Sequence, residues 1–229
     1  MFVFLSHIMD ETMRVWPGEP AHSVDVCTTI GKNGQQANTV IVHLPDHVGT
    51  HFDAPFHFNP KGPSITELPV DYFAYKGEDI LLLDIPKQPN EAVTVEDIKP
   101  HEETIKKKKL LLLRTGFETV RKEQPEVYQM EGPYLHPDLC RYMVITFPSL
   151  LCVGFDFLSV GAPGNGLSAE AHQWLLGKHT DKFITAIEDM ILSPLKQSRI
   201  DRITLGPLRV HGADSGQVSI IAELADNIS

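Results

Sequence analysis

Residues 47–57 read HVGTHFDAPFH, and this stretch holds four side chains that commonly bind metal ions: His47, His51, Asp53 and His57. All four positions are odd, so in an extended chain these side chains would point to one face. A straight strand of this length would span roughly 33 Å, too far for a single ion to reach both ends. Gly49 and Pro55 are residues at which a chain can turn. We therefore expect a bent loop and strand that folds its donors inward.

A helix is the competing interpretation of the same stretch. His47 and His51 are four residues apart, the spacing that zinc proteases use on a helix. Gly49 and Pro55 oppose a helix, and Asp53 would leave the shared face, so the bent loop is preferred. Two imidazoles and a carboxylate leave a position for water, which is typical of a catalytic site. Zinc is the first choice, and manganese would also suit a mixture of nitrogen and oxygen ligands.

The composition describes one ordinary globular domain, residues 1–229. Hydrophobic residues make up 42% and charged residues 22%, and no linker or repeat divides the chain. The formal net charge of −10 argues against a nucleic-acid partner. The three cysteines are widely scattered, as expected for reduced thiols in a cytoplasmic protein. The N-terminus resembles a first strand more than a signal peptide, and no apolar run reaches the length of a membrane helix.

Short apolar or β-branched runs predict a strand-rich core with flanking helices, an α+β (mixed α/β) fold. The expected strands are Phe2–Leu5, Val24–Thr29, Thr39–Leu44, Ile80–Ile85, Leu110–Thr115, Leu150–Phe155, Ile203–Leu208 and Val218–Leu224. A capping box at Thr94–Asp97 predicts a short helix. A second helix is expected over Ala169–Leu176, capped by Ser168 and ended by Gly177. A weaker helix signal covers Phe117–Glu123.

The 47–57 stretch resembles the HxGTHxDxPxH signature of the cyclase family of metal-dependent hydrolases, which includes bacterial kynurenine formamidase and isatin hydrolase. Further similarities cover most of the chain. They are WPG at 16–18, RTG at 114–116, VGFD at 153–156 followed by Ser159, and GAD at 212–214. The resemblance implies a swivelling β/β/α domain that assembles as a homodimer or homotetramer.

The resemblance also implies the roles of individual residues. His47, His51 and Asp53 would bind the first metal ion, and Asp53 would bridge to a second ion held by His172 and Glu188. One or two zinc ions are implied. His57 would be the catalytic acid and base, and Trp16 would flank an aromatic substrate. A bound metal ion lowers the pKa of its water and so favours hydrolysis near neutral pH.

The resemblance implies hydrolysis of a non-peptide C–N bond in a small molecule, with an aromatic amide as the expected substrate class and arylformamidase activity as the first expectation. In that reaction N-formylkynurenine gives kynurenine and formate. The chain departs from the formamidase pattern after Ser159 and at Ser215–Ser219. Isatin-type cyclic amide hydrolysis therefore stays an alternative, as does a metal-binding family member without catalysis. A structural zinc site, which usually closes with four protein ligands, is the alternative outside enzymes.

Overall fold

The computed structural model describes residues 1–10 and 13–225. Its strands are β1 (Phe2–Phe4), β2 (Ser23–Thr28), β3 (Thr39–His43), β4 (His51–Asp53), β5 (Ala74–Lys76), β6 (Ile80–Asp84), β7 (Ala92–Val93), β8 (Leu110–Arg114), β9 (Tyr134–Leu135), β10 (Cys152–Phe155), β11 (Thr185–Glu188), β12 (Ile200–Pro207) and β13 (Ser215–Leu224). Its α-helices are α1 (Val95–Ile98), α2 (Glu102–Ile105), α3 (Glu118–Glu123), α4 (Pro125–Met130), α5 (Pro137–Thr146) and α6 (Ser168–Leu175).

Nine of the strands in the described residues form one sheet, in the order β5-β12-β13-β4-β11-β10-β8-β6, with β1 also paired to β13. Strands β6, β8, β10 and β11 are parallel, whereas β4, β5, β12 and β13 join through antiparallel pairings. The parallel strands are continuous apolar runs such as ILLLD and LLLLR, as strands covered on both faces require.

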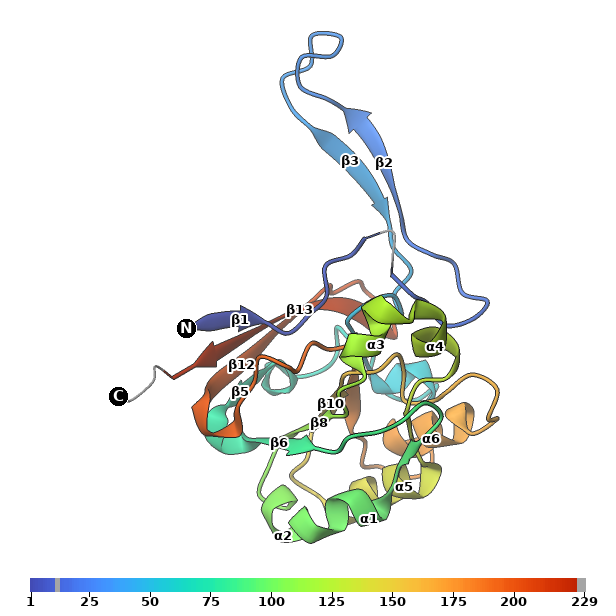
Figure 1. The fold of residues 1–229 in the computed structure, drawn as a ribbon, viewed down its shortest axis with the longest axis vertical. Helices are drawn as coiled ribbons and strands as arrows, with labels where there is room; N and C mark the ends of the chain where they lie inside the picture. Colours follow the sequence, from blue (N-terminus) through green and yellow to red (C-terminus); the bar gives the residue numbers. More distant parts are fainter. Residues whose placement is uncertain (11–12, 226–229) are drawn as a thin grey trace.

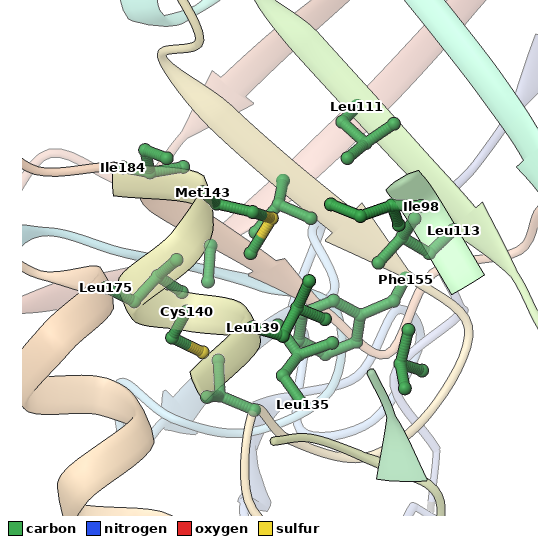
Figure 2. Packing of buried hydrophobic residues seen from close by; sticks show 14 of the residues in the cluster. Ile98, Leu111, Leu113, Leu135, Leu139, Cys140, Met143, Phe155, Leu175 and Ile184 are labelled. Carbon is green, nitrogen blue, oxygen red and sulfur yellow. The ribbon is translucent and has the colours of Figure 1, made fainter. Parts of the chain in front are cut away.

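The two faces of the parallel strands pack into two separate cores. Leu111 and Leu113 of β8 face the helices, and Leu110 and Leu112 face the antiparallel strands. Figure 2 shows residues of α5 such as Met143 packed toward the sheet. The molecule is therefore layered as antiparallel strands, parallel strands and helices. This mixed, strand-rich architecture confirms the predicted fold class.

All eight predicted strands are present, with ends shifted by up to three residues. The capping box at Thr94 is also present, since the Thr94 amide donates to Asp97 Oδ2 at 2.7 Å. One helix cap was wrongly predicted: α6 begins at Ser168 itself and Leu167 occupies the cap position, so Ser168 caps nothing. Gly177, at φ +78°, follows α6 as expected.

Strands β2 and β3 form a hairpin that extends away from the layered body (Figure 1). The hairpin forms its own two-stranded sheet, and its strands are exposed along almost their whole length. The start of β2 and the end of β3 lie next to the body, and the turn between them lies farthest from it (Figure 1). Among the described helices, none is long and apolar enough to cross a membrane.

Candidate metal centre

The pairing of β4 with β11 places three acidic or imidazole side chains together. His51 lies opposite Glu188, and Asp53 lies opposite Ala186. Because side chains alternate along a strand, His51, Asp53 and Glu188 share the face on the helical side, whereas Phe52 enters the opposite core. His51 Nε2 lies 3.2 Å from Glu188 Oε2 and 3.5 Å from Asp53 Oδ1. The three residues are almost completely buried.

Turns on both sides of β4 bring the two outer histidines back to this group. Gly49 has φ +67°, a conformation that favours glycine, and a Cβ there would meet Met13 Sδ at 2.6 Å. Pro55 begins a short 3-10 turn that carries His57. The rings of His47 and His57 consequently lie 4.0 Å apart between centroids. The expected bent segment with converging donors is confirmed.

His172 reaches the same group from α6, the helix over Ser168–Leu175. Its Nε2 lies 3.6 Å from Glu188 Oε1 and 4.0 Å from Asp53 Oδ2. His47 Nδ1 lies 3.2 Å from Asp53 Oδ1. The structure therefore brings together all five side chains predicted as ligands and also His57. Donor atoms of His51, Asp53 and Glu188 form one compact group, and those of His47, Asp53 and His57 form another.

The ring hydrogen bonds fix which nitrogen of two histidines faces the group. His51 Nδ1 lies 2.7 Å from Gly49 O, and His172 Nδ1 lies 2.8 Å from Ser168 O. A carbonyl oxygen can only accept, so each Nδ1 carries a proton and Nε2 is the nitrogen that would offer a lone pair to a metal ion. This backbone support is the arrangement that commonly orients histidine ligands.

Three atoms at the centre of the group lack hydrogen-bond partners. They are His51 Nε2, Asp53 Oδ1 and Asp53 Oδ2, and all three are buried. An unpaired buried carboxylate is costly unless a cation or donor meets it. Nitrogen and carboxylate oxygen are ligands of zinc and manganese alike. The residues present therefore fit a divalent metal ion. The donor set suits zinc and manganese and does not distinguish between them.

Charges in the group perturb the pKa values strongly. Burial opposes the charged form of His47, but Asp53 and the hydrogen bond to Asp214 outweigh it and raise the pKa of His47 to about 11. Burial alone would raise the pKa of Asp53, yet the imidazoles of His47 and His57 hold it well below its usual range. Without a metal ion, the folded chain therefore keeps a proton on His47 at neutral pH.

Glu188 is held in place from the side opposite His51. Its Oε1 accepts hydrogen bonds from Val160 N at 2.7 Å and from Ser159 Oγ at 3.0 Å. Burial and the nearby charge of Asp53 both disfavour the charge of Glu188, but the adjacent imidazoles of His172 and His51 outweigh them and lower the pKa of Glu188 to about 2. Oε2 remains directed toward His51. Ser159, a position in the family-like VGFD…S pattern, thus positions this carboxylate.

Asp214 is a site residue to which the sequence analysis gave no role. Its Oδ2 lies 2.8 Å from His57 Nδ1 and 3.2 Å from His47 Nε2, so one carboxylate joins both outer histidines. Burial, together with the neighbouring Asp214, raises the pKa of Asp46 beside it. In the sequence, only the family-like GAD motif at 212–214 marked Asp214. The motif did not reveal the contacts of Asp214 with His47 and His57.

A cavity of about 320 Å³ opens next to the group. Its wall includes His47, His51, His57, His172 and Glu188. Trp16 lines the cavity, and its contact with an aromatic substrate stays a prediction. Sequence reasoning missed Phe58, which stacks on the ring of His172 at 4.5 Å between centroids. Leu158 adds apolar surface, and Arg14 and Glu19 add one charge of each sign. The cavity can thus hold a small molecule with an apolar ring.

The cysteines lie away from the cluster. No group of potential metal ligands within residues 1–10 and 13–225 includes a cysteine. Cys140 and Cys152 are buried in the two cores, and burial raises the pKa of Cys152 to about 12. The sequence analysis gave Arg114 no chemical role. Its Nε donates a hydrogen bond to Asp84 Oδ1 at 2.5 Å, which links the neighbouring strands β8 and β6.

Comparison with known proteins identifies similar sequences across the chain. The family model described as "Putative cyclase" matches residues 3–185. A kynurenine formamidase of Bacillus cereus is 26% identical over 220 residues, which cover 96% of each chain. An uncharacterised protein of Haemophilus influenzae is 41% identical over 120 residues, 52% of this chain and 83% of that relative.

Solved structures share the fold. Isatin hydrolase A from Labrenzia aggregata, bound to benzyl benzoate, superposes with a TM-score of 0.80 at 19% identity, covering 97% of this chain and 93% of that one. A predicted metal-dependent hydrolase from Bacillus stearothermophilus gives a TM-score of 0.68 at 19% identity, covering 97% of both. At such low identity these two similarities establish the architecture alone. Together with the sequence relatives, they support an enzyme of the metal-dependent hydrolase class.

Proposed function

The chain belongs to the cyclase family of metal-dependent hydrolases, and we propose that it hydrolyses the non-peptide C–N bond of an aryl formamide. N-formylkynurenine, cleaved to kynurenine and formate, is the first candidate substrate. The observation that carries the proposal is the buried donor group beside the cavity: Asp53 has two oxygens without hydrogen-bond partners, and four other members of the group line the cavity wall.

Five side chains would hold the metal. His51 and His172 offer Nε2, His47 offers Nδ1, and Asp53 and Glu188 offer carboxylate oxygens. A divalent ion bound there would lower the pKa of water and polarise a carbonyl oxygen. Asp53 lies within both compact donor groups, so it is the residue best placed to serve two ions if two bind. Zinc is the first candidate metal and manganese the second.

His57 would move the proton. Asp214 accepts the Nδ1 proton of neutral His57 at 2.8 Å, which leaves Nε2 as the basic atom. His57 lines the cavity, so Nε2 can accept a proton from the attacking water. The same nitrogen then delivers that proton to the leaving nitrogen of the amide. Asp214 orients the ring and supports the imidazolium that forms between the two steps.

The cavity wall favours an aromatic substrate with a charged tail. Trp16, Phe58 and Leu158 provide an apolar surface for the ring. Arg14 and Glu19 at the same wall offer charges of opposite sign, which match the carboxylate and ammonium groups of an amino acid. N-formylkynurenine carries both groups, whereas isatin carries neither. This difference favours the formamide over the cyclic amide.

The test is hydrolysis measured by absorbance with N-formylkynurenine and with isatin, on protein depleted of metal and then resupplied with zinc or manganese. We expect turnover of N-formylkynurenine that disappears on depletion and returns with the metal, at a kcat/KM well above that for isatin. Faster hydrolysis of isatin would replace the proposed substrate. Metal-loaded protein without activity on either would contradict an aryl amide hydrolase and leave a metal-binding role.

A further inference from the structure

Asp189 directly follows the candidate ligand Glu188 at the end of β11 and is almost completely buried. Its backbone φ is +53°, a left-handed conformation that is uncommon outside glycine and that asparagine and aspartate tolerate best. The chain therefore bends as soon as it has placed Glu188. Backbone conformations of this kind persist where the surrounding structure fixes them, and they cluster at functional sites.

The carboxylate of Asp189 is held by two helices. Its Oδ1 accepts hydrogen bonds from the Tyr128 hydroxyl of α4 at 2.5 Å and from Arg121 Nε of α3 at 3.0 Å. Its Oδ2 accepts a hydrogen bond from Arg121 Nη2 at 3.2 Å, so the guanidinium contacts both oxygens. Among the described residues, no group of potential metal ligands includes Asp189. This carboxylate is therefore an anchor and not a ligand.

The backbone of Asp189 is joined to the segment that carries His51. Asp189 O accepts a hydrogen bond from Thr50 Oγ1 at 2.5 Å, and Thr50 directly precedes His51. Thr50 Oγ1 in turn accepts a hydrogen bond from His7 N at 2.9 Å. His51 and Glu188 are partners in the register of β4 and β11. Asp189 thus links the neighbours of two candidate ligands, while its side chain is fastened to α3 and α4.

This arrangement contributes little to the stability of the fold. The side chains of Arg121 and Asp189 are 11% and 2% exposed, so their ion pair has lost most of its hydration. Replacing a buried ion pair by apolar residues is often neutral or stabilising, which makes such a pair weak evidence for a stabilising role. A left-handed backbone conformation also costs free energy outside glycine. Two features with little benefit for stability therefore meet at the residue beside Glu188.

We propose that Asp189 is a positioning residue. Anchored by Arg121 and Tyr128, it fixes the relative placement of Glu188 and His51, whose Oε2 and Nε2 lie 3.2 Å apart. This inference rests on the proposed function, because it concerns the metal ion that these two side chains would hold. Residues that support metal ligands without touching the ion commonly change metal affinity by about 10–100-fold.

The first test is Asp189→Asn, studied by competition for zinc with a chromophoric chelator and by the visible spectrum of the cobalt-substituted protein. Asparagine tolerates the left-handed backbone, so the variant removes the charge while the bend is kept. We expect the Kd for zinc to rise about 10–100-fold. The bands of bound Co²⁺ should also shift, because they report the geometry of the ligands around the ion.

Asp156→Asn is the matched control. Asp156 is also a fully buried carboxylate, and it accepts three hydrogen bonds from Thr115 and Gly116. Within the part of the chain that the structure describes, it belongs to no group of potential metal ligands. Its variant should keep the zinc Kd and the cobalt spectrum of the wild-type protein, even if its Tm falls. An equal loss of affinity in both variants would overturn the proposal, as would unchanged affinity in Asp189→Asn.

A double variant separates positioning from stability. Arg121→Met and Asp189→Asn each leave one buried charge without its partner, whereas the two together remove both charges. We expect the double variant to recover Tm relative to Arg121→Met, while its zinc Kd stays raised. Recovery of Tm and zinc affinity together would overturn the proposal. All affinities are measured at temperatures at which circular dichroism shows the variants to be folded.

A milder variant covers the case in which Asp189→Asn does not fold. Tyr128→Phe removes one hydrogen bond to Asp189 Oδ1 and should raise the zinc Kd by a smaller factor. Unchanged zinc affinity and an unchanged cobalt spectrum in Tyr128→Phe would then overturn the proposal.

The metal measurements also distinguish this inference from the proposed function. A wild-type chain that binds neither zinc nor cobalt would overturn both. A chain that binds zinc and loses affinity in Asp189→Asn, yet leaves aryl formamides intact, would overturn the proposed substrate and support the role of Asp189.

Discussion

At the scale of single residues, the candidate site is defined by buried polar atoms that have no hydrogen-bond partner. Asp53 is fully buried with both carboxylate oxygens lacking partners, while backbone carbonyls orient the rings of His51 and His172 toward it. Asp214 plays a comparable part for His47 and His57. His57 thus has the geometry of a proton carrier, and His47 that of a ligand supported by an outer carboxylate.

Two substitutions should separate these roles. His57→Ala should lower kcat by about 10²–10⁴-fold, the usual contribution of general acid–base catalysis, with metal content unchanged. Asp214→Asn, in contrast, should weaken metal binding by about 10–100-fold, because His47 loses the carboxylate that orients its ring. Kinetics at saturating metal and metal analysis of both variants measure this. If His57→Ala lost its metal too, His57 would be a ligand and not the proton carrier.

At the scale of elements, the site depends on β4 lying between β11 and β13. Phe52 of β4 pairs with Gly216 of β13, and a Cβ at Gly216 would lie 2.4 Å from the backbone oxygen of Leu208. A backbone atom cannot turn aside as a side chain can, so this position of β13 has no room for a methyl group. The close approach holds the start of β13 against the chain that follows β12.

Gly216→Ala should therefore lower the free energy of unfolding by about 1–3 kcal/mol, the usual cost of overpacking. Gly206→Ala on the neighbouring strand β12 is the matched control, since the nearest atom to its added Cβ lies at 3.6 Å, an ordinary contact. Denaturant unfolding of the two variants provides the comparison. Equal stability of both would show that β13 can shift to accept the methyl group.

Sequence patterns identified eight of the strands, including the three-residue β1, and the motif indicated a strand at β4, but β11 was missed. Strand β11 has only four residues, too few for a periodic pattern, and its neighbours in the sheet define it as a strand. Helix α5, PDLCRYMVIT, was also missed, because its apolar and β-branched residues do not indicate a helix without the sheet against which they pack.

The motif and the family resemblance marked all five candidate metal ligands, and the structure brings these five side chains together, while their role as ligands stays a prediction. The contacts of Asp214 were not predictable, since 157 residues separate it from His57 and only the fold brings them together. No sequence pattern marks Arg14, Glu19 or Phe58 as cavity residues. Arg14 and Glu19 reach the cavity from the loop before β2, and Phe58 reaches it from the turn after β4.

At the scale of the whole molecule, binding of the proposed metal ion would be linked to folding through protons. In the metal-free folded chain the pKa of His47 is about 11, compared with 6.5 ordinarily. Because the pKa of His47 is higher in the folded chain than in the unfolded chain, its protonation stabilises the folded state. This contribution to the free energy of unfolding is complete below pH 6.5 and declines as the pH rises toward 11. A metal ion needs the imidazole neutral, so its contribution changes in the opposite direction.

We therefore expect the Tm of chelator-treated protein to fall between about pH 7 and about pH 9, and the Tm of zinc-saturated protein to hold or rise over the same range. At a single pH, excess metal should raise the Tm, because it binds only the folded chain. Calorimetry with and without metal measures both effects. His47→Gln should reduce the fall in the metal-free form, and the raised pKa of His51 accounts for a remaining fall. Parallel curves for the two wild-type forms would contradict the linkage.

The pairing of β4 on both of its edges has a consequence for the order in which the candidate site can form. Asp53 on β4 pairs with both Ala186 and Ser215, so the three-residue strand is held only by segments that are distant from it in sequence. Its donors meet Glu188 only after β11 has docked beside β4, and any ion that needs this whole donor set would therefore bind a chain that is already largely folded.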